Sequence, residues 1–184
     1  MIEVKADPEN YSTNDNRFRF VFNDQTQKEF PGTTLTIMGS TKAGIFNSLT
    51  IYKNEEPITK LDFKYKYSSS SKFEAIKFNR FVAVGFSGYF YLYDLSDESI
   101  KLFIDFGGYF VQFKIFEKHL LIAYNSGVYC LTEYGDIKWH NGNIGIDGVI
   151  LSEVKKGKLY GSGEIDPPDG WQDFILDIES GKQL

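Results

Sequence analysis

Hydrophobic and polar residues alternate with a period of two along most of the chain, which is the pattern of half-buried β-strands. Near the N-terminus, Phe18, Phe20 and Phe22 are predicted to share one face of a strand. Further strands are predicted at residues 33–38, 45–52 and 60–67, separated by turn segments that contain Gly or Pro. The pattern therefore predicts a β-rich chain.

A hairpin-like segment occurs more than once in the C-terminal part. Residues 81–92 align with residues 120–131 at an offset of 39, which matches Gly88 with Gly127. A third copy starts at residue 159 with the same offset and has six additional residues before residue 174. Each copy continues into a turn and a short fourth strand, the last of them at residues 182–184. A period near 40 with about four strands per unit is typical of β-propeller blades.

The sequence thus predicts an all-β fold of antiparallel four-stranded units that are β-propeller-like or stacked as sheets. Three units are clear, at about residues 73–107, 108–145 and 146–184. Residues 1–72 are predicted to form an N-terminal β segment, which is either a degenerate first unit or a β cap.

Two segments, residues 127–139 and 174–184, resemble the blade repeats of PQQ-like, quinoprotein-type β-propellers. In those repeats a strand ending in a Leu-Asp-like pair is followed by a Thr/Ser-Gly turn and a strand closed by Trp or Leu. The resemblance covers about residues 73–184 and implies a fold, not redox chemistry, because the family's cofactor-binding groups cannot be placed on this sequence. Residues 161–171 are also similar to a motif in small uncharacterised bacterial proteins, to which no activity attaches.

Charge narrows the classes of partner. The chain has 184 residues, with 20 Lys and Arg against 25 Asp and Glu and a formal net charge of −5. The basic residues are scattered among carboxylates, which argues against a nucleic-acid binder, whereas an acidic protein suits basic partners. The first residues lack a basic and apolar signal pattern, and no apolar run is long enough to span a membrane. We therefore expect a cytoplasmic protein with no membrane association.

Groups for covalent or acid–base catalysis are few. The only histidines, His119 and His140, are predicted to lie in solvent at strand ends. The only cysteine, Cys130, is predicted to be a buried, inert thiol. Gly-rich phosphate-binding motifs are absent from the sequence. We expect no enzymatic activity and no cofactor.

The most chemically suggestive segment is an acidic and aromatic loop predicted at residues 164–173. Glu164, Asp166 and Asp169 are a weak candidate for a Ca²⁺ site, although their spacing is not that of an EF-hand. An alternative function follows from the same loop, namely a carbohydrate-binding or glycoside-active β protein, with or without Ca²⁺. Carboxylates can bind sugar hydroxyls while aromatic rings stack on the sugar.

Aromatic residues make up 17% of the chain, and several fall at turns or on the polar side of the alternation. Because Tyr and Trp are enriched at interfaces, the leading hypothesis is a non-enzymatic protein-binding module. Its sharpest form is an immunity or antitoxin-type inhibitor of a basic toxin such as a nuclease. A third alternative is a subunit whose units complete a ring with another chain. The predicted partner-binding residues are Tyr89, Asp94, Asp97, Glu98, Tyr134, Glu164, Asp166, Asp169, Trp171 and Asp173.

Overall fold

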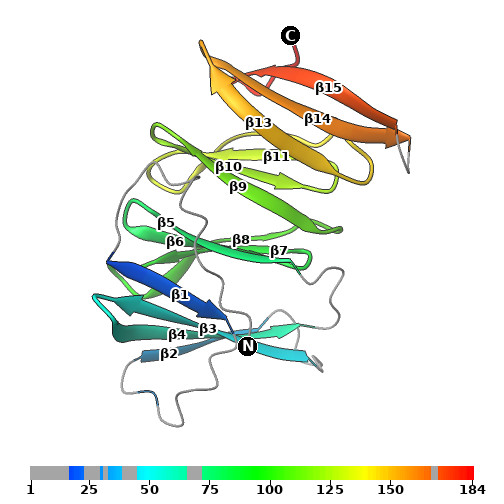
Figure 1. The fold of residues 1–184 in the computed structure, drawn as a ribbon. Coiled ribbons are helices and arrows are strands. Elements are labelled where there is room, and N and C mark those ends of the chain that lie inside the picture. The colour runs from blue at the N-terminus through cyan, green and yellow to red at the C-terminus, as the bar shows by residue number, and fades with distance from the viewer. Residues whose placement is uncertain (1–16, 23–29, 31–32, 39–44, 66–71, 167–169) are drawn as a thin grey trace. The chain divides into compact units, whose positions relative to one another are not determined.

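The protein is all-β in the part of the chain that the structure describes. The computed structural model describes residues 17–22, 30, 33–38, 45–65, 72–166 and 170–184, and these residues form fifteen strands in four sheets (Figure 1). The chain divides into two compact units, residues 1–68 and 69–184. The predicted fold class, an all-β chain of blade-like sheets, is confirmed.

The first unit contains one four-stranded sheet in the order β1-β3-β4-β2. Strand β1 (Phe18–Phe22) pairs with β3 (Ile45–Lys53), and β3 pairs with β4 (Glu56–Tyr65), both antiparallel. Strand β2 (Thr33–Met38) is parallel to β4, which the prediction of antiparallel units did not include. Two parallel neighbouring strands must be joined by a crossover connection. Here the chain passes from β2 to β3, on the far side of β4, before it returns as β4.

The turn between β3 and β4 is tighter than the gap between the predicted strands at residues 45–52 and 60–67. Asn54 and Glu55 have φ angles of 51° and 64°, so both central residues are left-handed, as in a two-residue type I′ hairpin turn. Strand β4 consequently begins at Glu56. Side chains of the two long strands, such as Leu49 and Leu61, are fully buried in the core of this sheet.

The second unit contains three antiparallel sheets whose strands follow one another in chain order. The first sheet consists of β5 (Phe73–Phe78), β6 (Phe81–Phe86), β7 (Tyr89–Asp94) and β8 (Ser99–Asp105). The second consists of β9 (Phe110–Phe116), β10 (His119–Tyr124), β11 (Gly127–Leu131) and β12 (Ile137–Asn141). The third consists of β13 (Val149–Lys155), β14 (Lys158–Asp166) and β15 (Gly170–Asp177).

The predicted fourth strand of this last sheet, at residues 182–184, is reduced to a single bridge. Gln183 pairs with Leu176, and two flanking hydrogen bonds run from Asp177 N to Lys182 O and from Leu184 N to Ile175 O. Among the described residues, this is the one pairing on that edge of β15.

The sheets of the second unit stack face to face (Figure 1). Groups that meet across adjacent sheets are separated along the chain by the length of the sequence repeat. Gln112 Nε2 donates to the carbonyl of Leu151, 39 residues away, at 3.1 Å, and Trp139 Nε1 donates to the carbonyl of Ile178, also 39 residues away, at 2.8 Å. A core of twelve buried residues fills the space between the second and third sheets: Leu121, Ala123, Val128, Cys130, Trp139, Ile144, Val149, Leu151, Leu159, Phe174, Leu176 and Ile178. The 39-residue offset is thus the distance along the chain between groups that meet across adjacent sheets.

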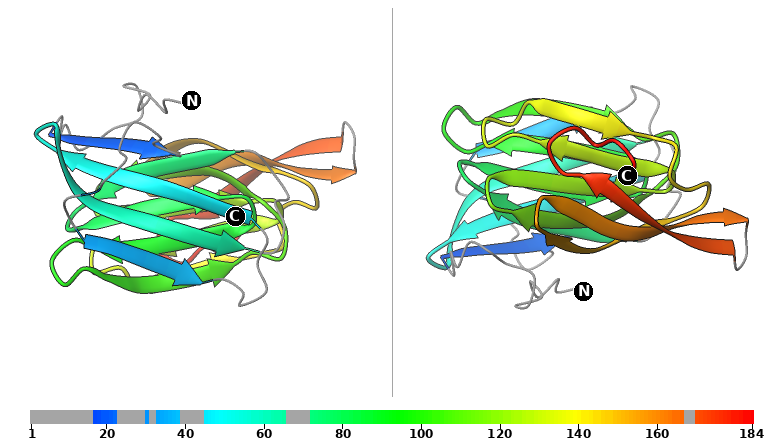
Figure 2. Two further views of the ribbon diagram at one scale, coloured as in Figure 1. Left: turned by 90° about the horizontal axis from the view of Figure 1, so that it is seen from below. Right: turned by 90° about the horizontal axis from the view of Figure 1, so that it is seen from above.

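Because all strands of the second unit are antiparallel, their connections gather at two opposite ends. We call one the Tyr134 end; it holds residues 79–80, 95–98, 117–118, 132–136, 156–157 and 178–182. We call the other the Trp171 end; it holds residues 87–88, 106–109, 125–126 and 142–148 and the adjoining ends of β14 and β15. The β14–β15 hairpin extends beyond the other strands of the unit at the Trp171 end (Figure 2).

Candidate functional site

The predicted partner-binding residues do not form one site, because they divide between the two ends of the second unit. Four of them, Asp94, Asp97, Glu98 and Tyr134, lie at the Tyr134 end. The others that the structure describes lie at or near the Trp171 end: Tyr89, Glu164, Asp166, Trp171 and Asp173. Asp169 lies outside the described residues.

Asp94 stabilises a turn at the Tyr134 end. Its carboxylate is buried, accepts hydrogen bonds from the backbone N–H and hydroxyl of Ser96 at 2.9 and 2.6 Å, and pairs with Arg80 at 2.9 Å. Burial acts to raise the pKa of Asp94, but the Ser96 hydrogen bonds and the Arg80 charge outweigh it and lower the pKa below its ordinary value. The carboxylate of Asp94 therefore binds groups within the unit. The prediction that Asp94 contacts a partner required an exposed side chain.

The other three predicted residues at this end are exposed. Asp97 accepts hydrogen bonds from the backbone and hydroxyl of Ser99, and Glu98 has a φ of 55° at the turn. Tyr134 is 69% exposed at the tip of the β11–β12 turn, where its N–H donates to Thr132 Oγ1. Tyr134 is thus the one predicted aromatic anchor that this end presents among the described residues.

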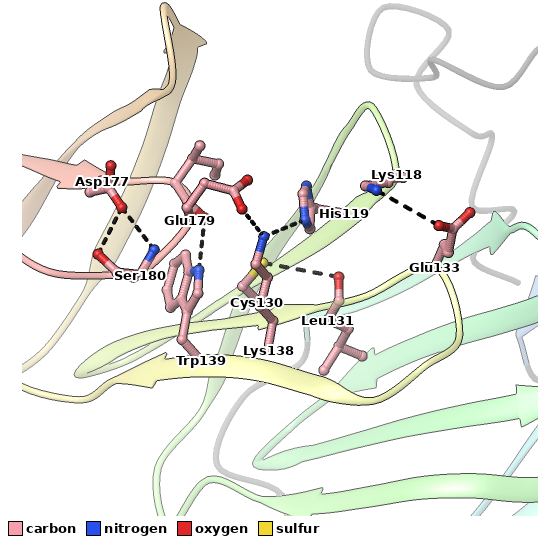
Figure 3. A network of polar contacts seen from close by, with 11 residues as sticks. Lys118, His119, Cys130, Leu131, Glu133, Lys138, Trp139, Asp177, Glu179 and Ser180 are labelled. Atoms are coloured by element: carbon pink, nitrogen blue, oxygen red, sulfur yellow. Dashed lines mark hydrogen bonds and ion pairs between the residues drawn. The ribbon is translucent and has the colours of Figure 1, made fainter.

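A charged network joins the second and third sheets at the Tyr134 end (Figure 3). Lys138 Nζ lies 2.9 Å from His119 Nε2 and 2.6 Å from Glu179 Oε2. An ammonium group has only donors, so His119 Nε2 accepts the hydrogen bond and the ring is the neutral tautomer with hydrogen on Nδ1. That Nδ1 is buried and has no hydrogen-bond partner among the described residues.

His119 is buried, which corrects the prediction that it lies in solvent. It is only 4% exposed because β10, which it begins, is an inner strand of its sheet. Burial and, next, the Lys138 charge lower the pKa of His119 below its ordinary value. The hydrogen bond from Lys138 correspondingly lowers the pKa of Glu179. The network is suited to fastening two sheets together, with a histidine held neutral.

Cys130 lies in the core below this network, as the sequence predicts. It is fully buried, and burial raises the pKa of its thiol to about 12. A nucleophilic cysteine needs a lowered pKa and access to solvent, so this thiol has neither property of a reactive one.

At the Trp171 end, the predicted acidic loop is for the most part strand. Glu164 and Asp166 belong to the end of β14, whereas Trp171 and Asp173 belong to the start of β15. Glu164 is only 7% exposed. Its carbonyl accepts a hydrogen bond from the N–H of Ile146, and its own N–H donates to the carbonyl of Gly148. Its burial corrects the expectation that it faces a partner, because the connection 142–148 covers this part of the strand.

Exposed apolar and acidic side chains lie on the segments next to the buried Glu164. Ile146, Ile165 and Trp171 are 59%, 41% and 42% exposed, and Asp147 and Asp166 are also exposed. We call these five residues the Trp171 surface. No ion pair among the described residues involves either of its carboxylates.

Residues of the β8–β9 and β12–β13 connections contact parts of the Trp171 surface. The Tyr109 hydroxyl donates to the carbonyl of Asp147, and burial followed by the Asp147 charge raises the pKa of Tyr109. A Cβ added at Gly148 would lie 2.9 Å from the Trp171 ring, so the indole rests directly on this backbone. The sequence reasoning missed Ile146 and Asp147, although an isolated apolar–acidic pair between Gly145 and Gly148 was a usable signal.

A second aromatic group lies at the same end, between the first and second sheets. Tyr129 and His140 stack with ring centroids 3.9 Å apart, and Tyr124 hydroxyl lies 2.7 Å from His140 Nε2. Phe106 stacks on Tyr124 at 4.9 Å. Burial lowers the pKa of His140 and raises the pKa of Tyr129. His140 is exposed near the end of β12, as the sequence predicts. Its ring is nevertheless held in place by the contacts with Tyr124 and Tyr129.

Tyr89, the remaining predicted anchor, is half-buried at the start of β7. Its ring lies 5.8 Å from that of Phe86 and 6.1 Å from that of Phe103, so it belongs to an aromatic ladder on the first sheet. Part of the aromatic content therefore packs along the sheet.

Within the described part of the chain, no group of three or more His, Cys, Asp or Glu side chains is placed to hold a metal ion, and Asp169 of the Ca²⁺ candidate is not part of it. No helix among the described residues is long and apolar enough to cross a membrane.

Comparison with known proteins gives similarity in structure only. No family model matches the chain, and no curated protein matches it. BamB from Moraxella catarrhalis is 12% identical with a TM-score of 0.49, and the match covers 74% of this chain and 42% of BamB. The Pan2 WD40 domain from Neurospora crassa is 12% identical with a TM-score of 0.44, and the match covers 74% of this chain and 45% of that domain. The matched part therefore spans less than half the length of each of these two structures.

Proposed function

We propose that the protein is a non-catalytic protein-binding module and that a basic protein binds at its Trp171 surface. The sharpest form of this proposal is an immunity or antitoxin-type inhibitor of a basic toxin. The observation that carries it is the grouping of exposed Ile146, Ile165 and Trp171 with exposed Asp147 and Asp166 on one end of the second unit.

The chemistry of this surface suits a protein partner with basic side chains. Trp and apolar anchors that lose water on binding supply most of the affinity of typical interfaces. The carboxylates steer a cationic partner and increase the rate of association. Among the described Lys and Arg residues of the second unit, Lys72 alone lies at the Trp171 end, so few internal cations compete for these carboxylates.

The test is affinity capture from the native cells with four tagged chains: the unchanged protein, Trp171→Ala, the pair Asp147→Asn and Asp166→Asn, and Tyr134→Ala. Tyr134 is the matched control, because it is an exposed aromatic residue at the opposite end. We expect one basic protein to be captured by the unchanged chain and by Tyr134→Ala. Trp171→Ala should reduce its capture by at least about tenfold, as expected for an interface anchor. Equal capture by all four chains would contradict the proposed surface.

Salt and co-expression separate the parts of the proposal. We expect capture to weaken as salt rises from 50 to 300 mM, roughly the range over which exposed charges become screened, and to weaken less for the Asn pair. If the captured protein is toxic when expressed alone and harmless when co-expressed with this chain, the inhibitor form is supported. If the captured protein is not toxic, the proposal of a binding module stands and the inhibitor form is refuted.

A further inference from the structure

The turn at residues 178–182 is docked on strand β12 by side chains of that strand. Trp139 Nε1 donates to the carbonyl of Ile178 at 2.8 Å, and Asn141 Nδ2 donates to the carbonyl of Gly181 at 2.9 Å. A Cβ added at Gly181 would lie 2.5 Å from the Trp139 ring, so the turn also rests directly on the indole. The contact between the second and third sheets at the Tyr134 end therefore depends on how β12 holds this turn.

Lys138 supplies a further contact between β12 and the turn, and this contact involves His119. Lys138 is the extra residue of a β-bulge in β12, which brings its side chain to the same side of the sheet as that of Trp139 (Figure 3). Its Nζ lies 2.6 Å from Glu179 Oε2 on the turn and 2.9 Å from His119 Nε2 on the inner strand β10. Lys138 thus links a buried ring of the second sheet to a carboxylate of the turn.

His119 accepts this hydrogen bond only while its ring is neutral. An ammonium group has only donors, and a protonated imidazole has donors on both nitrogens. A proton bound at Nε2 would place two cationic donors 2.9 Å apart. The ring is 4% exposed, and its Nδ1 has no hydrogen-bond partner among the described residues. Protonation of His119 is therefore incompatible with the docked position of Lys138.

The charges that act on His119 come from three parts of the unit. Lys138 lies on β12, Glu179 lies on the turn that follows β15, and Lys118 and Glu117 lie on the turn before β10. Burial and, next, the Lys138 charge lower the pKa of His119 below 6.5, and the two carboxylates only partly oppose this. A histidine in solvent keeps a pKa of about 6.5. A proton consequently binds more tightly to a state in which the ring is uncovered and Lys138 has moved away.

We propose that His119, Lys138 and Glu179 form a proton-operated clasp: a proton bound by His119 displaces the Lys138 ammonium and releases the turn 178–182 from β12. The strands stay paired during this step, because β12 remains hydrogen-bonded to β11 and β15 to β14. The clasp is a regulatory device of the fold and does not depend on the partner proposed above.

Cys130 reports the release of the turn. Its thiol is fully buried and lies directly opposite Trp139 in the β11–β12 pair, in the core between the second and third sheets. The charges of Lys138 and Glu179 both act on this thiol, so the clasp lies beside the sulfur (Figure 3). Movement of the turn away from Trp139 is therefore expected to expose Cys130 to a thiol reagent.

The test is the rate at which a pyridyl disulfide reagent labels Cys130 between about pH 8 and pH 5. Three chains are compared: the unchanged protein, His119→Gln and His140→Gln. Each rate is divided by that of the same chain unfolded in urea at the same pH, which removes the pH dependence of the reagent. His119→Gln keeps an acceptor for Lys138 but takes up no proton. His140→Gln is the matched control, because this histidine lies at the Trp171 end of β12.

We expect the normalised labelling rate of the unchanged chain to rise below about pH 6.5, approaching tenfold per pH unit, which is the slope for uptake of one proton. His140→Gln should show the same rise, whereas His119→Gln should show a flat profile down to about pH 5. A rate that does not change with pH in the unchanged chain, or a rise that persists in His119→Gln, overturns the clasp. Loss of the rise in His140→Gln as well would also overturn it, because the effect would not be specific to His119.

Hydrogen exchange of the unchanged chain locates the opening and serves equally if His119→Gln does not fold. The indole N–H of Trp139 reports release of the turn, because it donates to Ile178, whereas the backbone amide of Leu121 in β10 reports unfolding of the sheet. Corrected for intrinsic rates, exchange of the indole should accelerate below about pH 6.5 and stay at least about tenfold faster than that of Leu121. Equal exchange at the two sites would mean that the turn is released only when the sheet unfolds, which contradicts a clasp.

Discussion

The two ends of the second unit are built by the same strands but differ in how their carboxylates are used. At the Tyr134 end, acidic side chains pair with basic ones: Asp94 with Arg80, Asp136 with Lys101, Glu133 with Lys118 and Glu179 with Lys138. At the Trp171 end, Asp147 and Asp166 have no ion pair among the described residues and stand beside exposed apolar side chains. Acidic residues near the strand ends thus have two different roles, pairing with basic side chains of the unit and facing outward.

The largest expected contrast between the ends is in stability. Asp94→Ala removes a buried carboxylate and leaves the Ser96 N–H and Arg80 without their partner. Loss of hydrogen bonds to a charged group is expected to lower the free energy of unfolding by about 2–3 kcal/mol. Asp166→Asn at the other end should change it by less than about 0.5 kcal/mol, as for other exposed sites. Urea unfolding of both variants measures this, and equal effects would remove the distinction between the ends.

The pH dependence of stability is the next largest effect. The pKa values of His119 and His140 are lowered in the folded unit, whereas unfolded histidines have a pKa of about 6.5. Below about pH 6.5 the unfolded chain therefore binds protons that the folded chain does not, and the free energy of unfolding falls as the pH falls. A further loss follows in more acidic solution, because Asp94 and Glu179 also have lowered pKa values in the folded unit.

Urea unfolding at pH 8, 6.5, 5.5 and 4.5 gives this profile. We expect a flat region between pH 8 and 7 and a decline below it. The variant His119→Gln should show a shallower decline, because it removes one of the two histidines. A free energy of unfolding that is constant from pH 8 to pH 4.5 would contradict the lowered pKa values of the two histidines.

The two histidines also provide a comparison of smaller size. Burial and, next, the Lys138 ammonium lower the pKa of His119, whereas burial alone lowers the pKa of His140. Lys138→Met should therefore raise the pKa of His119 and leave that of His140 unchanged, as followed by NMR titration of the ring protons. An unchanged pKa of His119 would mean that the hydrogen bond between Lys138 and His119 is not formed in solution.

Periodicity predicted most of the fold because strand alternation is a local property. Residues 33–38 were predicted as a strand and form β2 with those bounds. The parallel pairing of β2 with β4 could not be predicted, because it depends on the order of strands in the sheet and not on any local pattern.

The site was harder to predict, because exposure depends on neighbours that are distant in sequence. Glu164 and Asp166 are two residues apart and were expected to act together, yet the connection 142–148 buries the first and leaves the second exposed. Asp94 was expected to face a partner, but Arg80 on a neighbouring turn takes its charge. A sequence pattern locates acidic turns, and only the packing of sheets decides which of them stay open.

The smallest expected effect concerns the two tryptophans, which distinguish the core from the Trp171 surface. Trp139 is 7% exposed and its indole N–H bonds to the Ile178 carbonyl, whereas Trp171 is 42% exposed. Acrylamide should therefore quench the fluorescence of the Trp139→Phe variant, which retains Trp171, several-fold more efficiently than that of Trp171→Phe. Partner binding should then protect Trp171 selectively, because an interface anchor loses its contact with water. Similar quenching of both variants would show that Trp171 is covered before any partner binds, and the surface proposed for binding would have to lie elsewhere on the unit.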